Sequence, residues 1–136
     1  MRTEDFLRQV TVLPGLSGNE GEVARFIAEA FRPYCDEVTI DPLNSVIGHI
    51  RGNGPKVMLC AHLDEIGLMV SDIEKDGSLR MRSVGGVDPR ILPGMRVTVY
   101  GRERLMGIIG AKAPHLLSAA DREKNYARED LYVDLG

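Results

Sequence analysis

The sequence is short of several residue types, and each shortage narrows what the protein can be. It has no tryptophan, 5% aromatic residues and two cysteines in 136 residues. Two cysteines cannot form the disulfide framework of a small secreted domain, so Cys35 and Cys60 are predicted to be reduced thiols. A length of 136 residues is enough for one modest domain or for one and a half small ones.

The charge and hydropathy of the sequence argue against a nucleic-acid partner and a membrane partner. The net charge is -3 at pH 7 with both signs interspersed, which gives no electrostatic attraction to nucleic acid or to an anionic membrane. No apolar run approaches the roughly 18 residues that span a bilayer. The charged N-terminal stretch MRTEDFLRQV lacks the apolar core of a signal peptide. We therefore expect a cytoplasmic protein with no nucleic-acid and no membrane partner.

The first half of the sequence changes from helical to strand-like periodicity. Apolar residues at helical spacing predict a short helix over residues 4–12 and a second helix that begins after Ser17, where Ser17 and Glu20 fit a capping box. The buried face of the second helix is predicted to contain Val23, Phe26, Ile27, Ala30 and Phe31. Strands are then predicted at 36–40, 45–50 and 56–61. The last of these is apolar at successive positions, which is typical of a strand covered on both faces of an α/β layer domain.

The second half predicts short antiparallel strands and no long helix. Asp76-Gly77 and Gly101 mark two hairpin turns, and residues 130–136 read as one more strand, a pattern typical of a small β-barrel. Residues 118–130 have almost no apolar content and predict an exposed loop. Because the chain stops in or just after a strand, we expect an incomplete barrel and a piece of a longer protein. The predicted domains are residues 1–69 and 70–136.

The stretch LCAHLDEIGLMV, residues 59–70, contains the pattern that most suggests chemistry. His62 directly follows the predicted strand, and ligands of open α/β sheets bind at the carboxyl ends of strands. Asp64 can fold back towards the imidazole, and a carboxylate on one ring nitrogen makes the other nitrogen a better metal ligand. On spacing alone, however, a strand-end histidine hydrogen-bonded to backbone is the more frequent outcome, since His-x-Asp is common by accident.

The remaining candidate residues are better explained by structural roles. His49 alternates with apolar residues in a predicted strand, and Cys60 reads as a small core residue. Glu65 is expected to be solvated or to pair with a loop, and His115 to have a structural or contact role. Gly85-Gly86 does not lead from a strand into a helix N-terminus, so it predicts a turn rather than a phosphate loop.

The stretch MLCAHLDEIGLMV resembles the metal-binding signature of the glutamyl aminopeptidase family of co-catalytic zinc aminopeptidases, whose members build large tetrahedral shells. Other stretches resemble the same family in the same order: LPGLSGNEGEVARFI, DEVTIDPLNSVIGHIRG, VGGVDPRILPGMRVTVYG, GIIGAKAPHLL and DLYVDLG. The match is imperfect at Leu43, where the family has glycine. The resemblance extends over essentially the whole chain.

This resemblance implies an α/β fold: the N-terminal portion of a zinc-aminopeptidase layer domain, followed by an incomplete inserted β-barrel of the oligomerisation type. It implies His62 as a metal ligand, with the catalytic carboxylate Asp64 behind it. It also implies two divalent metal ions (zinc or cobalt) in the complete enzyme, peptide substrates and a homo-oligomer. No residue matches the family's bridging Asp, general-base Glu or second histidine ligand, which follow the inserted barrel. We therefore expect a metalloaminopeptidase fragment that is inactive alone.

Two other functions stay open at this point. Relatives in this family have been named endoglucanases, but a glycoside hydrolase needs paired carboxylates at the sugar bond, and sugar platforms rely on aromatic stacking. The low aromatic content argues against that function. A non-catalytic assembly module is the third hypothesis, because the barrel part is better represented in the sequence than the active site.

Overall fold

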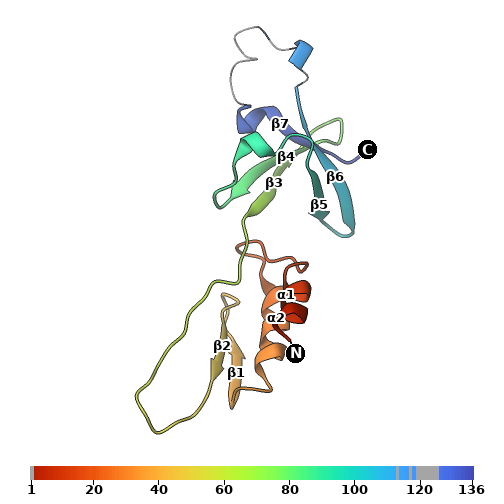
Figure 1. Cartoon of the computed structure of the whole chain (residues 1–136). Helices are drawn as coiled ribbons and strands as arrows, with labels where there is room; N and C mark the ends of the chain where they lie inside the picture. Colours follow the sequence, from red (N-terminus) through yellow and green to blue (C-terminus); the bar gives the residue numbers. More distant parts are fainter. Residues whose placement is uncertain (1, 113, 117, 119–125) are drawn as a thin grey trace. The chain divides into compact units, whose positions relative to one another are not determined.

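The computed structural model describes residues 2–112, 114–116, 118 and 126–136, and the chain divides into two compact units, Met1–Glu65 and Ile66–Gly136 (Figure 1). The first unit contains two helices and a hairpin, and the second is built mainly of strands. This is the predicted order of an α/β part followed by a β part. The predicted boundary after residue 69 falls inside strand β3 (Gly67–Ile73), which lies wholly in the second unit.

Both predicted helices are present in the first unit. They are α1 (Thr3–Val10) and α2 (Gly21–Phe31). Their contact includes Phe6 and Phe26, whose rings stack with centroids 5.6 Å apart. An aromatic pair of this kind contributes about 1 kcal/mol beyond the apolar area it buries.

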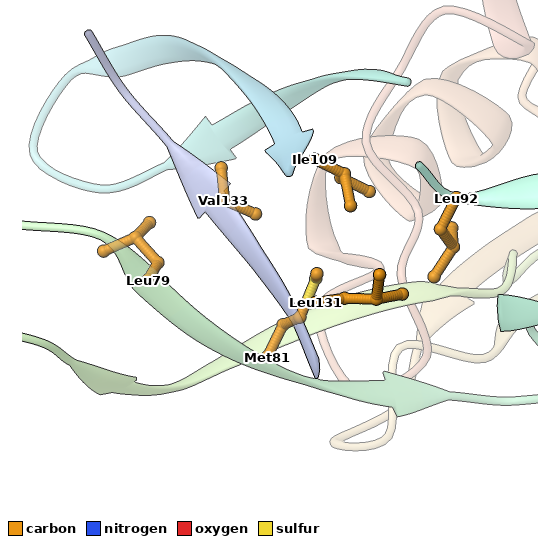
Figure 2. Packing of buried hydrophobic residues seen from close by; sticks show 6 residues of the cluster. All are labelled: Leu79, Met81, Leu92, Ile109, Leu131 and Val133. Atoms are coloured by element: carbon orange, nitrogen blue, oxygen red, sulfur yellow. The ribbon is translucent and has the colours of Figure 1, made fainter. Parts of the chain in front are cut away.

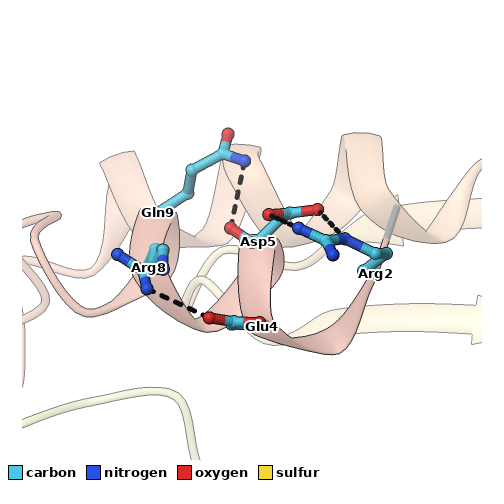
Figure 3. Close-up of polar contacts among 5 residues, drawn as sticks. All are labelled: Arg2, Glu4, Asp5, Arg8 and Gln9. Carbon is cyan, nitrogen blue, oxygen red and sulfur yellow. Dashed lines mark hydrogen bonds and ion pairs between the residues drawn. The ribbon is translucent and has the colours of Figure 1, made fainter.

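The polar side of α1 is stabilised by ion pairs within the helix (Figure 3). Arg2 Nε lies 2.9 Å from Asp5 Oδ2, and Arg8 Nη2 lies 3.0 Å from Glu4 Oε1. The Gln9 side-chain amide also donates to the Asp5 carbonyl. These groups are exposed, so each pair adds only a few tenths of a kcal/mol.

The predicted start and buried face of α2 are partly wrong. Glu20 is the N-cap residue and no side chain caps the helix, so Ser17 and Glu20 do not form a capping box. The fully buried residues of α2 are Val23, Ala24 and Ala28, whereas the larger side chains of the predicted face are half-buried or exposed. Small side chains lie deepest because α2 packs closely on the hairpin beside it.

That hairpin consists of β1 (Glu37–Ile40) and β2 (Val46–His49), which pair antiparallel with Glu37 opposite His49. It confirms the strands predicted at 36–40 and 45–50. The backbone of Gly48 approaches the end of α2 so closely that a Cβ there would lie 2.9 Å from Phe31 Cδ2 and 2.7 Å from Cys35 Sγ. A larger residue at this position would therefore force the side chain of Phe31 or Cys35 to shift.

The strand predicted at 56–61 does not form. Residues 55–64 have no regular structure, and Val57, Met58 and Leu59 are 81%, 84% and 94% exposed. Cys60 is also exposed, so it is not the core residue that the apolar run predicted. A strand needs a neighbour for its backbone N–H and C=O groups, and none of the described strands pairs with this segment. The apolar sequence is present without the sheet that would cover it.

The second unit is a five-stranded antiparallel sheet. Its strands are β3 (Gly67–Ile73), β4 (Leu79–Val84), β5 (Arg96–Tyr100), β6 (Arg104–Ala111) and β7 (Leu131–Asp134). The spatial order is β3-β4-β7-β6-β5, with both predicted hairpins and the predicted last strand. Among the described strands β3 and β5 do not pair, so the sheet is open and does not close into a barrel.

One face of this sheet carries the hydrophobic core of the second unit. Figure 2 shows its buried side chains, which come from β4, β6, β7 and the loop after the short 3-10 helix η1 (Pro89–Ile91): Leu79, Met81, Leu92, Ile109, Leu131 and Val133. Ile109 and Leu131 are each 1% exposed, the lowest values in this cluster. Buried side chains occupy alternate positions of β4 and β7, as period-two alternation requires.

The loop predicted over 118–130 falls largely outside the described residues, because 119–125 are not among them. Its described end forms the 3-10 helix η3 (Arg128–Asp130) directly before β7. A further 3-10 helix, η2 (Pro114–Leu116), lies earlier in the same unit. No helix among the described residues has both the length and the apolar character needed to cross a membrane.

An ion pair fixes the loop that enters η1 and gives a measurable pH dependence. Arg90 donates from its backbone N and from its guanidinium to Asp88, and these bonds lower the pKa of Asp88 to about 2. A carboxyl with a depressed pKa stabilises the fold above its ordinary pKa, and this contribution is lost as pH falls towards 2. We expect Arg90→Ala to raise the pKa of Asp88 most of the way to its ordinary value, as measured by NMR titration of the carboxyl carbon. An unchanged pKa would show that the backbone N–H bond, not the guanidinium, sets it.

Candidate metal site

His62 lies in the irregular segment that leads out of the first unit, with its side chain 86% exposed. Its ring nitrogen Nδ1 lies 3.1 Å from the Asp64 backbone oxygen and 3.2 Å from Asp64 Oδ1. Both neighbours are acceptors, so a neutral ring carries its proton on Nδ1 and presents the lone pair of Nε2 to solvent. No described residue forms a hydrogen bond with Nε2. The ring is not turned into the core, and this geometry is the one that a metal-ligating histidine needs.

Asp64 folds back onto His62, and its second oxygen is held as well. Asp64 Oδ2 accepts a hydrogen bond of 2.5 Å from the hydroxyl of Ser17. This bond, helped by the backbone and by His62, holds the pKa of the Asp64 carboxyl below its ordinary value against the opposing effect of desolvation. The carboxylate is therefore ionised at neutral pH and fixed at both oxygens.

The loop that carries Ser17 is docked on the segment after His62 by main-chain bonds. Glu65 N donates to Gly15 O at 2.7 Å, and Ser17 N donates to Glu65 O at 3.3 Å. Gly15 N in turn donates to Glu65 Oε1 at 3.2 Å. The loop-pairing role expected for Glu65 is confirmed, and it brings two segments nearly fifty positions apart in sequence into contact.

Glu20 is a second carboxylate close to this loop, and its hydrogen bonds keep it in place. Its Oε1 accepts from Gly18 N at 2.6 Å, and Asn44 Nδ2 donates to its Oε2 at 3.4 Å. The bond from Gly18 lowers the pKa of Glu20, whereas the nearby charge of Asp64 acts in the opposite direction. Glu20 therefore shapes the loop and adds negative charge beside Asp64.

His62 and Asp64 are chemically suited to supply one ligand of a metal site. A neutral imidazole backed by a carboxylate fits one ligand of a divalent ion. Within the described ranges, however, no three His, Cys, Asp or Glu side chains gather closely enough to hold an ion. His49, at the end of β2, and His115, in η2, are both exposed.

The sequence did not indicate that Ser17 belongs with His62 and Asp64. It lies 47 positions before Asp64, and locally it matches the start of a helix, which is the role predicted for it. Nothing in the sequence around Ser17 points to the stretch around Asp64. Only the docking of the loop through Glu65 brings them together.

Comparison with known proteins gives a consistent result. Residues 44–136 match the family described as M42 glutamyl aminopeptidase. Over 135 residues the chain is 36% identical to the lysyl aminopeptidase of Pyrococcus furiosus. The matched segment makes up 97% of this chain and 39% of that protein.

Solved structures agree with the sequence comparison. The TET aminopeptidase from the marine sediment archaeon Thaumarchaeota archaeon SCGC AB-539-E09 matches with a TM-score of 0.93 and 36% identity, covering 98% of this chain and 38% of that one. The TET1 peptidase of Pyrococcus horikoshii, which can assemble into a tetrahedron or a large octahedral shell, matches with a TM-score of 0.84 and 32% identity over 99% of this chain and 41% of that one. The chain spans about two fifths of the length of these proteins.

Proposed function

The chain belongs to the M42 glutamyl aminopeptidase family, and from this premise we propose that it supplies part of the active site of a metal-dependent aminopeptidase. In this proposal His62 is a metal ligand and Asp64 is the carboxylate that orients it. The observation that carries the proposal is the geometry of the pair: Nδ1 of His62 is occupied by Asp64, and Nε2 faces outward.

Each side chain has a defined task in peptide hydrolysis. When bound, the divalent ions polarise the first peptide carbonyl and lower the pKa of water. Asp64 keeps the His62 ring in the Nδ1–H tautomer, and its negative charge makes Nε2 a stronger donor of electron density. The exposure of the ring leaves room for a peptide N-terminus and for ligands from outside the described residues.

The proposal extends to cofactor, partner and location. Two divalent ions, zinc or cobalt, fit a family of co-catalytic peptidases, and the substrates are peptides with a free N-terminus. The assembly of the Pyrococcus horikoshii TET1 peptidase into shells supports a homo-oligomer for the complete protein. The cytoplasm is the proposed location. The domains predicted at 1–69 and 70–136 are proposed as the α/β catalytic layer and the inserted oligomerisation domain, with the boundary moved to follow Glu65.

A fusion protein tests the proposed activity. This chain, joined to the part of the Pyrococcus furiosus lysyl aminopeptidase that lies beyond the matched segment, is expected to hydrolyse aminoacyl p-nitroanilides when zinc, cobalt or manganese is added. The 136-residue chain alone is expected to release no p-nitroaniline under the same conditions, because its described residues hold no group of three metal-ligating side chains. Metal-dependent turnover by the chain alone would show that the site has been assigned to the wrong residues.

The endoglucanase alternative is tested with the same fusion. The absence of tryptophan and the 5% aromatic content argue against a sugar platform in this part of the protein. We expect no release of reducing ends from carboxymethylcellulose by a fusion that hydrolyses the anilides. A fusion with the opposite selectivity would favour the glycosidase.

A further inference from the structure

Three groups form a continuous chain of contacts from a loop hydroxyl to the candidate ligand. Ser17 Oγ donates to Asp64 Oδ2 at 2.5 Å, and Asp64 Oδ1 lies 3.2 Å from His62 Nδ1. The two oxygens of one carboxylate thus have different partners on opposite sides. A contact that fixes Oδ2 of Asp64 therefore also sets the direction of Oδ1.

The hydroxyl of Ser17 is not needed to dock its loop. The main-chain bonds between Glu65 and the pair Gly15 and Ser17 join the loop to the segment after His62, and Glu65 Oε1 adds a third bond. These bonds use backbone atoms of Ser17 and leave its side chain available. The hydroxyl is therefore not required to hold the loop in place.

Asp64, in contrast, depends on that hydroxyl for its orientation. Its side chain is 39% exposed. Neighbouring atoms therefore restrain its rotation on one side, and the other side is open to water. Its contact with His62 is shared with the Asp64 backbone oxygen, which already accepts from Nδ1. Without a partner for Oδ2, the carboxylate is free to turn to water and sample other staggered rotamers.

We propose that Ser17 is a positioning residue for His62: its hydroxyl fixes the Asp64 carboxylate in the rotamer that places Oδ1 against the imidazole. The inference rests on the proposed function, since the ring is positioned for a metal ion. Ser17 does not touch the metal, the substrate or His62 itself. It acts only through Asp64, so its loss weakens the orientation of the ring and leaves the ligand in place.

The test is NMR of the 136-residue chain with paired substitutions at residue 17. Ser17→Thr keeps the hydroxyl, and Ser17→Val has nearly the same shape without it, so the pair isolates the hydrogen bond from packing. Three-bond couplings to the Asp64 carboxyl carbon report its χ1 rotamer, and long-range 1H–15N correlation reports the His62 ring. The wild-type chain and Ser17→Thr are expected to show one dominant rotamer, and Ser17→Val and Ser17→Ala averaged couplings with shifted His62 ring nitrogens.

A matched control is available in the other unit. Ser78 Oγ donates to Asp76 Oδ1 at 2.8 Å in the β3–β4 turn, so Ser78→Ala removes the same kind of bond within the unit that does not contain His62. It is expected to leave the Asp64 and His62 signals unchanged.

The fusion gives a second readout, by chelator competition for zinc. Ser17→Val is expected to weaken zinc binding about tenfold relative to Ser17→Thr, the lower end of the effects seen when an outer partner of a ligand is removed. Equal zinc affinity in the two variants, or unchanged Asp64 couplings in Ser17→Val, would overturn the inference. A fusion whose hydrolysis needs no metal contradicts the proposed function instead, and it leaves the NMR comparison as a separate result.

Discussion

Replacing His62 by alanine is expected to reduce kcat/KM of the fusion for aminoacyl p-nitroanilides by about a thousandfold or more. The groups of a two-metal hydrolase act as a unit, so removing one of them costs nearly as much as removing several. In the proposed site the imidazole is the ligand that this chain contributes, and alanine leaves the Asp64 carboxylate with nothing to orient. The measurement is the metal-dependent rate with each of the three cations, together with the metal content after dialysis.

The two other histidines provide the controls. His49 ends β2 and His115 lies in η2, and both are exposed, as His62 is. Alanine at either position is expected to leave kcat/KM within about twofold, because surface substitutions of this kind perturb the fold by less than about 0.5 kcal/mol. If His49→Ala or His115→Ala abolished turnover while His62→Ala did not, the ligand assignment would be refuted.

Much of the β unit could be predicted because its signals are local. Gly77 has a φ of +87°, a value that glycine adopts without strain, and it directly follows Asp76 in the β3–β4 turn. The turn fixes the register of the hairpin, and the alternation of side chains then decides which residues face the core. An incomplete barrel was also predicted, and the described edge strands β3 and β5 do not pair with each other.

The strand predicted at 56–61 is absent because its formation depends on distant residues rather than on local signals. The run of apolar residues predicted a buried segment, but burial depends on neighbours elsewhere in the sequence. Val57, Met58 and Leu59 remain largely exposed because the described strands do not pair with them. The same dependence explains the error over Cys60, which was predicted to be buried only as a member of that strand.

Only one of the two contacts of Asp64 at the candidate site could be predicted, because only one of them is local in sequence. The pairing of His62 with Asp64 follows from a spacing of two residues, which needs only a local bend. The contact between Ser17 and Asp64 is long-range, and it arises because Glu65 bridges to the loop around Gly15. At Ser17 the sequence pattern predicted the start of a helix instead, because a serine hydroxyl can either cap a helix or donate a hydrogen bond to a carboxylate.

The largest effect on stability is expected from Ile109→Ala in the sheet of the second unit. Ile109 lies on β6 with 1% of its surface exposed and packs into the cluster shown in Figure 2. Removing three carbons from a site with no access to water loses their transfer free energy and leaves a cavity, which together cost roughly 2–5 kcal/mol. We expect the urea midpoint of the second unit to fall steeply, with tyrosine fluorescence or amide NMR as the probe.

The adjacent residue makes this prediction specific to the core. Ile108 precedes Ile109 on β6 and is 50% exposed, because successive side chains of a strand point to opposite faces. Ile108→Ala removes the same atoms from the same strand, so any loss of strand propensity is shared by the two variants. It is expected to shift the midpoint by less than half as much as Ile109→Ala, since half of its surface is already in water and its removal leaves no closed cavity. Equal shifts for the two variants would mean that the outer face of β6 is covered in solution, and that the sheet has a second buried side.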